Sequence, residues 1–222
     1  GTLHIRSVYD IDGNDSSIGI ATLADPAQTA AAERPARFLR IVKAVSIPDD
    51  NVLDFNNSAF GRSAQQLMRE IIGYVPIEPD GSVNLQVPAD IAFTLSVVDS
   101  DGKRISARHQ NWLQLRAGET RECRGCHTTS SELPHGRIDA QAPSANFGAL
   151  TSGSPFPNTQ PSLFTDAGES MAQTWTRING VRKPSVNIVF EDQWTDDSGA
   201  LSKAEGFALN YHDLLTSPPV NS

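Results

Sequence analysis

Five residues near the middle of the chain, Cys123-Arg124-Gly125-Cys126-His127, restrict its fold and chemistry more than any other segment. The pattern C-x-x-C-H is the attachment signal for c-type haem. Two thiols at this spacing can each add to one haem vinyl group, and the histidine that follows then lies beneath the iron as its proximal ligand. The sequence therefore predicts one covalent haem c, attached to Cys123 and Cys126, with His127 on the iron.

Three other interpretations of the cysteine pair compete with haem. A thioredoxin-like redox motif lies at the start of a helix after a strand, and no such pattern surrounds Cys123. A closed zinc site needs four ligands, whereas the chain has two cysteines in all, and Cys126 and His127 are adjacent. A disulfide across the short loop is the third. Haem is favoured over thiol redox chemistry or a disulfide, and zinc comes last.

The role of such a haem depends on its distal ligand. His135 is the first choice, because it lies eight residues beyond His127 and an extended chain of that length can span roughly 27 Å. Met171 is the second choice. The alternative for His135 is an exposed loop histidine, and the alternative for Met171 is a buried core methionine. An open sixth position is a further possibility, and the remaining candidate ligands are His4, His109, which lies just before the haem loop, His212 and Met68.

Three arginines flank the motif and are candidates to pair with the haem propionates: Arg121, Arg124 and Arg137. Solvated surface charges are an equally good explanation of each.

Composition limits the class of partner. The chain has 222 residues, a net charge of −8 and 38% hydrophobic residues, which suits a folded domain and argues against nucleic acid or anionic membranes as partners. It has no apolar run long enough for a membrane span and no signal peptide. We expect a piece of a longer exported protein, periplasmic or extracellular because haem c is attached after export. Its partner would be a redox protein or other domains of the same chain.

Short alternating apolar segments with Asp-Gly turns indicate a mainly β protein with few short helices. The expected strands are 3–9, 36–47, 83–87, 91–98, 103–108, 112–115, 186–194 and 207–211. Helical spacing of apolar residues predicts a short helix over 62–72, and another begins within 166–172. We expect one domain over 1–216, with a β-sandwich core at 35–122, a haem-binding segment at 123–175 whose coil wraps the haem edge, closing strands at 186–211, and a linker at 217–222.

The segment Asp10–Asp15 has carboxylates at alternate positions around Gly13, as at the start of a calcium loop. The acid expected twelve positions into such a loop is missing, because position 21 is Ala. A plain turn is the favoured alternative.

The stretches GYVPIEPDGSVNLQVPADIAFTLSVVDSDGKRI and NWLQLRAGETRECRGCH resemble the haem-bearing middle domain of hydrazine synthase α-subunit-like proteins. The resemblance covers roughly residues 35 to 135. It implies a transthyretin-like or immunoglobulin-like β-sandwich that leads into a haem c attachment loop. It does not imply hydrazine synthesis, which in that family needs further haem-bearing partners.

Two functions of different class follow. The first is electron transfer by a mono-haem c-type cytochrome domain, in which the iron has six ligands. The alternative is a haem enzyme with an open distal site, of peroxidase type or acting on small nitrogen compounds. No His-Arg distal pair in a helical setting stands out, so the sequence favours electron transfer. A third hypothesis is a spacer domain in which the haem only stabilises the structure.

Overall fold

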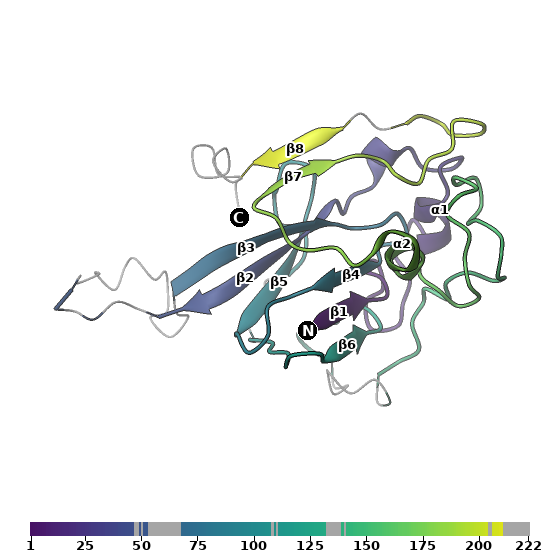
Figure 1. Ribbon diagram of the computed structural model, residues 1–222. Helices are drawn as coiled ribbons and strands as arrows, with labels where there is room; N and C mark the ends of the chain where they lie inside the picture. Colours follow the sequence, from purple (N-terminus) through teal and green to yellow (C-terminus); the bar gives the residue numbers. More distant parts are fainter. Residues whose placement is uncertain are drawn as a thin grey trace.

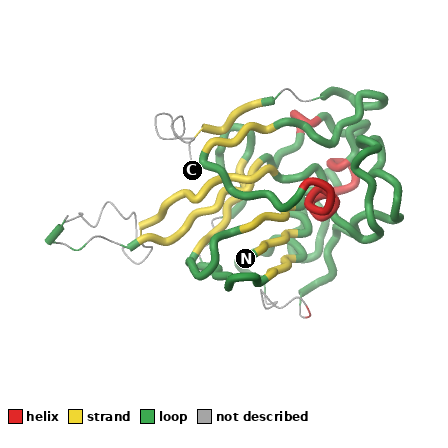
Figure 2. Tube along the Cα trace, in the orientation of Figure 1, coloured by secondary structure: helices red, strands yellow, loops and turns green. Residues whose placement is uncertain are grey.

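The computed structural model describes residues 1–46, 49, 51–52, 68–107, 109, 111–131, 139, 141–203 and 206–210. Strands and loops make up nearly all of this part of the chain (Figure 2). The mainly β prediction is therefore confirmed. The elements are β1 (Thr2–Ile5), α1 (Ile20–Ala24), a 3-10 turn (Ala31–Glu33), β2 (Phe38–Val45), β3 (Met68–Pro76), β4 (Val83–Gln86), β5 (Phe93–Val98), β6 (Thr120–Cys123), α2 (Met171–Asn179), β7 (Asn187–Phe190) and β8 (Phe207–Asn210).

The first sheet has the strand order β4-β1-β6 (Figure 1). β1 runs antiparallel to β4 and parallel to β6, so the N-terminal strand is central and β6 lies at an edge. The core assigned from sequence to 35–122 therefore extends to the N-terminus. β6 was not predicted, because its sequence, Thr-Arg-Glu-Cys, has no apolar alternation.

The second sheet has the order β3-β2-β5, with β2 antiparallel to both neighbours. Alternate residues of its strands, such as Leu39 and Ile41, point toward the first sheet and share one buried cluster with Leu3 and Leu85. The alternation of apolar and polar residues in the sequence thus predicts which side chains pack between the two sheets. The far ends of β2 and β3 project from the rest of the molecule (Figure 1).

β7 and β8 pair antiparallel, as predicted for segments 186–194 and 207–211. Their aromatic residues pack on the face of the second sheet that is turned away from the first. The Phe190 ring stacks on that of Phe207 with centroids 4.9 Å apart, and both meet Phe38 edge to face. The hairpin therefore closes a second, smaller core, and the part of the β3-β2-β5 sheet around Phe38, Tyr74 and Val98 is buried on both faces.

The helix predicted over 62–72 is wrong where the structure describes that segment. Residues 68–72 begin β3, and Met68 lies opposite Val45 of β2. Met68, Ile71 and Ile72 have helical spacing, but a β-branched pair also favours a strand, and pairing with β2 decides between the two. Residues 61–67 lie outside the described part of the chain.

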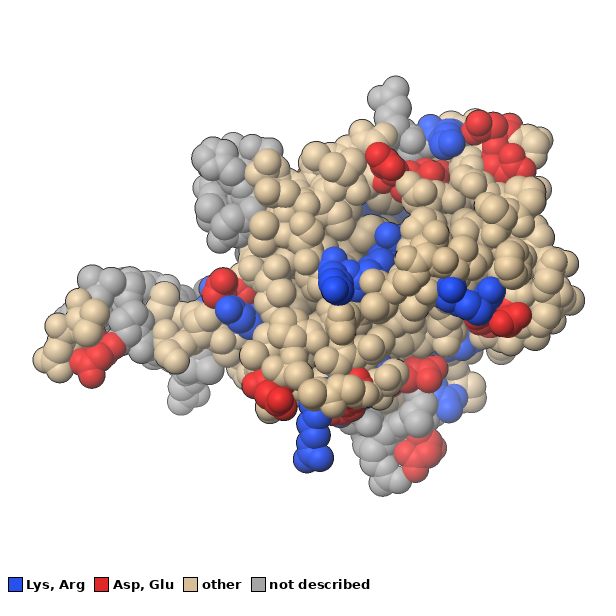
Figure 3. All heavy atoms as spheres, in the orientation of Figure 1, with Lys and Arg blue, Asp and Glu red and all other residues tan. Residues whose placement is uncertain are grey.

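The helix expected to open within 166–172 is α2. The Ser170 side chain accepts a hydrogen bond from the Gln173 amide, and the Gln173 side chain accepts one from the Ser170 amide, a capping box that fixes where the helix begins. Among the described residues, no helix is long and apolar enough to cross a membrane. On the face seen in Figure 3, basic and acidic side chains are interspersed in small groups, so no large patch of one sign marks a docking surface there.

Candidate functional site

The C-x-x-C-H segment leaves the edge strand β6 and continues alongside residues 6–12 in the parallel direction. The Cys123 carbonyl accepts a hydrogen bond from the Arg6 amide at 2.8 Å, and the Cys126 amide donates one to the Asp10 carbonyl at 2.8 Å. The Asp12 amide then donates to the Cys126 carbonyl at 3.0 Å. Both cysteines are half-buried and pack against the main core. The two thiols are thus held on one short loop at the rim of the first sheet.

Asp10 is the centre of this arrangement, a role that the sequence did not reveal. It is buried, and its Oδ1 accepts from the Gly13 amide at 2.8 Å while its Oδ2 accepts from the Ala145 amide at 2.8 Å. The Ser144 hydroxyl lies 2.9 Å from the same Oδ2 and 2.7 Å from the Arg124 carbonyl. The segment 141–146 therefore packs against the motif through Asp10.

Asp12 acts on the other side of the loop. Its Oδ2 accepts hydrogen bonds from the amide and the hydroxyl of Thr128 at 3.0 and 2.8 Å. These bonds hold the pKa of Asp12 below its usual range. Because Thr128 follows His127 directly, Asp12 fixes the backbone from which the histidine projects.

The contacts of these carboxylates fit a turn at Asp10–Asp15 better than a calcium loop. The carboxylates of Asp10, Asp12 and Asp15 accept hydrogen bonds from amides and hydroxyls of their neighbours. Within the described part of the chain, no three His, Cys, Asp or Glu side chains are grouped as metal ligands. The favoured alternative, a plain turn, fits this geometry.

His127 is exposed, and its Nδ1 lies 3.0 Å from the Thr128 carbonyl oxygen. A carbonyl oxygen only accepts hydrogen bonds, so Nδ1 carries the proton and the lone pair of the neutral ring is on Nε2. Metal-bound histidines show the same pattern, in which one ring N–H donates to a carbonyl and the other nitrogen binds the metal. His127 is therefore suited to bind iron through Nε2.

His109 lies against His127, although the two residues come from different segments. The ring centroids are 6.3 Å apart and the ring planes meet at 75°. The His109 Nδ1 is 2.7 Å from the Asn111 carbonyl oxygen and 3.2 Å from the Thr94 hydroxyl on β5. Burial, opposed by the Asn111 hydrogen bond and aided by the charge of His127, lowers the pKa of His109, which favours the neutral imidazole.

The thiols lack the electrostatics of a redox-active pair. Burial raises the pKa of Cys126 to about 12, with Cys123 and Asp10 adding to the effect, and burial also raises the pKa of Cys123. Reactive cysteines in C-x-x-C motifs have lowered pKa values, because only the thiolate attacks. This disfavours thiol–disulfide chemistry.

The other candidate ligands lie in different surroundings. Met171 is completely buried with Leu163 and Trp194, the environment of a core methionine. His4 is buried, and its Nε2 lies 3.0 Å from the Ser170 hydroxyl at the start of α2. Met68 lies on β3 opposite Val45. The first choice, His135, and also His212, lie outside the described residues.

The predicted propionate partners differ from one another. Arg121 is engaged with Glu119, its Nη2 lying 2.8 Å from Oε1. Arg124 has no ion-pair partner among the described residues. Arg137 lies outside them.

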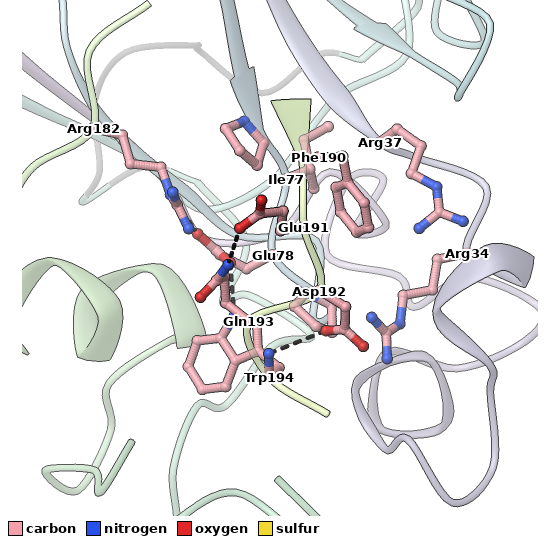
Figure 4. Close-up of a pocket in the computed structure, with 12 residues that line it drawn as sticks. Arg34, Arg37, Ile77, Glu78, Arg182, Phe190, Glu191, Asp192, Gln193 and Trp194 are labelled. Atoms are coloured by element: carbon pink, nitrogen blue, oxygen red, sulfur yellow. Dashed lines mark hydrogen bonds and ion pairs between the residues drawn. The ribbon is translucent and has the colours of Figure 1, made fainter. Parts of the chain in front are cut away.

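A separate cavity lies between β7, the strand end at Ile77 and the segment before β2 (Figure 4). Glu78 accepts hydrogen bonds there from Arg182 Nε at 2.9 Å and Trp194 Nε1 at 2.7 Å. The cavity measures only about 20 Å³, room for one water molecule. We regard it as a packed charge cluster rather than a ligand site.

Comparisons with known proteins agree with the resemblance noted in the sequence. The family described as the hydrazine synthase alpha subunit middle domain matches residues 35–128, a range that ends one residue beyond His127. Among solved structures, the chain is similar to hydrazine synthase from Kuenenia stuttgartiensis, with a TM-score of 0.37 and 16% identity. That match covers 62% of this chain and 19% of the other. No curated protein matches. The family match supports a relationship to this domain over residues 35–128. The match to the solved structure spans about a fifth of that chain.

Proposed function

We propose that the chain is a mono-haem c-type cytochrome domain that transfers electrons within a larger exported protein. The observation that carries the proposal is the geometry of the motif: two half-buried thiols on one loop, followed by an exposed His127 whose Nδ1 faces a carbonyl. The match to a hydrazine synthase domain supports a role as one component of a larger protein.

The residues present suit a covalent haem. Each thiol can add across one vinyl group, so that a carbon–sulfur bond forms and the thiol hydrogen passes to the neighbouring vinyl carbon. His127 Nε2 supplies the nitrogen ligand, and Asp10 and Asp12 hold the loop on either side. Bound haem c supplies a one-electron redox centre.

The shared core of the two three-stranded sheets supports a β-sandwich of the transthyretin-like or immunoglobulin-like class. The parallel pair β1–β6 distinguishes it from an all-antiparallel sandwich. In this proposal Cys123, Cys126 and His127 would hold the haem on the loop that follows β6, and a periplasmic or extracellular location follows from attachment after export.

The test is expression of the full chain in a host that matures haem c. We expect a covalent c-type haem, seen as a c-type pyridine haemochrome and as haem that stays on the denatured chain. The matched control, Cys123→Ala with Cys126→Ala, should lose it. A properly folded chain that leaves this host without covalent haem would refute the proposal and revive the thiol and zinc hypotheses.

Electron transfer is tested separately on the haem-loaded chain. Reversible one-electron reduction, with no change in absorption on adding cyanide or carbon monoxide, is the expected result. A ferric spectrum that responds to these ligands would instead favour the enzyme with an open distal site.

A further inference from the structure

The contact between His109 and His127 brings together two imidazoles from loop segments that are attached to different sheets. His127 follows the edge strand of the first sheet. His109 is held to β5 of the second sheet, where the Thr94 hydroxyl donates to the His109 carbonyl at 3.0 Å. The two rings are brought to 6.3 Å across the rim of the sandwich.

Both rings make the same kind of hydrogen bond. The Nδ1 atom of each lies close to a backbone carbonyl oxygen, that of Thr128 for His127 and that of Asn111 for His109. Both rings therefore carry their proton on Nδ1 and their lone pair on Nε2, and a metal ligand needs a lone pair. Two such imidazoles side by side form a matched pair of ligands.

The spacing of the rings distinguishes two coordination geometries. Each metal–imidazole nitrogen bond is about 2 Å long, so two imidazoles on opposite sides of one metal have ring centres about 6 Å apart. At the tetrahedral angle of a zinc site the same bonds bring the centres to about 5 Å. The observed 6.3 Å fits ligands on opposite sides. Haem iron takes its two axial ligands in this way.

We propose that His109 is the distal haem ligand, opposite His127, an inference that rests on the proposed function. The iron would then have two histidines and no open position. Such a site transfers electrons and does not bind small substrates. His109, a minor candidate in the sequence, thereby takes the place of His135 as first choice.

The experiment compares full-length ferric chains carrying covalent haem. The unaltered chain should be low-spin by absorption and by electron paramagnetic resonance. His109→Ala should keep its covalent haem but become high-spin, and added imidazole should restore the low-spin spectrum. His109→Met should show the long-wavelength ferric band of methionine ligation. His135→Ala, His4→Gln and Met171→Leu are the matched controls and should leave the spectrum unchanged.

The outcomes separate the two proposals. An unaltered chain without haem refutes both. If His109→Ala keeps both its covalent haem and its low-spin spectrum, only the role of His109 is refuted. Loss of the low-spin spectrum in His135→Ala or in Met171→Leu would then identify the true ligand. The unaltered chain could instead bind one equivalent of zinc, and His109→Ala could abolish this binding without changing the haem spectrum. That result would assign the histidine pair to zinc. Circular dichroism of each variant confirms that the fold is retained.

Discussion

Gly125 leaves no space for a side chain between the two cysteines. A Cβ at this position would lie 2.6 Å from Asp10 Cγ and 2.8 Å from the Asp10 carbonyl oxygen. Because that oxygen also accepts the Cys126 amide, the backbone cannot move aside without loss of a hydrogen bond. We expect Gly125→Ala to lower the free energy of unfolding by about 1–3 kcal/mol in denaturant titrations and to reduce haem attachment.

Gly199→Ala is the matched control, because its added Cβ would have no heavy atom nearer than 3.8 Å. We expect a change within about 0.5 kcal/mol. Equal stability of the two variants would contradict the close packing of Gly125 on Asp10.

His4 makes the stability depend on pH. Burial, aided by Arg6, lowers its pKa from 6.5 to about 4. The Glu122 carboxylate lies 3.8 Å from Nδ1 and opposes this shift, but its side chain is 45% exposed and solvent weakens the effect. Between pH 6.5 and 4 the unfolded chain binds a proton that the folded chain does not. Stability is therefore full above pH 6.5, and about 3 kcal/mol of it is lost as the pH falls to 4.

The measurement is urea unfolding at a series of pH values for the unaltered chain and for His4→Gln, in which a neutral amide remains beside Ser170. The variant should have a shallower slope between pH 6.5 and 4. Identical slopes would mean that His4 is protonated in the folded chain.

At the scale of elements, Asp80 joins three segments that are far apart in sequence. It is buried, and its carboxylate accepts hydrogen bonds from Ser82 before β4, from Asn146 Nδ2 at 2.9 Å and from the Met171 amide of α2 at 2.9 Å. Asp80→Asn would turn an NH₂ group toward these donors. We expect a loss of about 2–4 kcal/mol in unfolding free energy, measured in denaturant.

Asp101→Asn controls for the loss of one charge, because Asp101 is exposed in the turn after β5. It should change stability by less than about 0.5 kcal/mol. If Asp80→Asn were as stable as this control, the three segments would be held together by other contacts.

The same elements show what sequence patterns can predict here. Strands with apolar alternation, such as β2 and β5, were located because burial of one face leaves a period of two. β6 was missed because its residues are mostly polar and it is placed by pairing with β1, a contact across more than a hundred residues. The start of β3 was assigned to a helix because i, i+3, i+4 spacing in a short apolar run does not distinguish helix from strand.

The site follows the same division. Cys123, Cys126 and His127 stand out as candidates in the sequence, because the chemistry proposed for them depends on local spacing. Asp10 and Asp12 left calcium open as an alternative to a plain turn, because the sequence shows their alternation but not the amides of Thr128 and Ala145 that donate hydrogen bonds to them. His109 was only a minor candidate, because its approach to His127 depends on the packing of two sheets.

At the scale of the whole molecule, an iron held by both histidines would cross-link the two sheets. His127 lies on the loop that follows β6 of the β4-β1-β6 sheet, while His109 is held to the β3-β2-β5 sheet through Thr94. The bond between His109 and iron would exist in the folded chain and break on unfolding, so it would add to stability only when haem is attached.

A double-mutant cycle isolates this contribution. His109→Ala is introduced into the haem-loaded chain and into the haem-free chain that carries Cys123→Ala and Cys126→Ala, and all four proteins are unfolded in guanidinium in the ferric state. We expect His109→Ala to cost about 1–3 kcal/mol more when haem is present. The excess stays below the full strength of the bond, because another histidine can bind the iron in the unfolded chain. Equal costs with and without haem would mean that His109 only packs against its neighbours, and the sheets would then be joined by their apolar core alone.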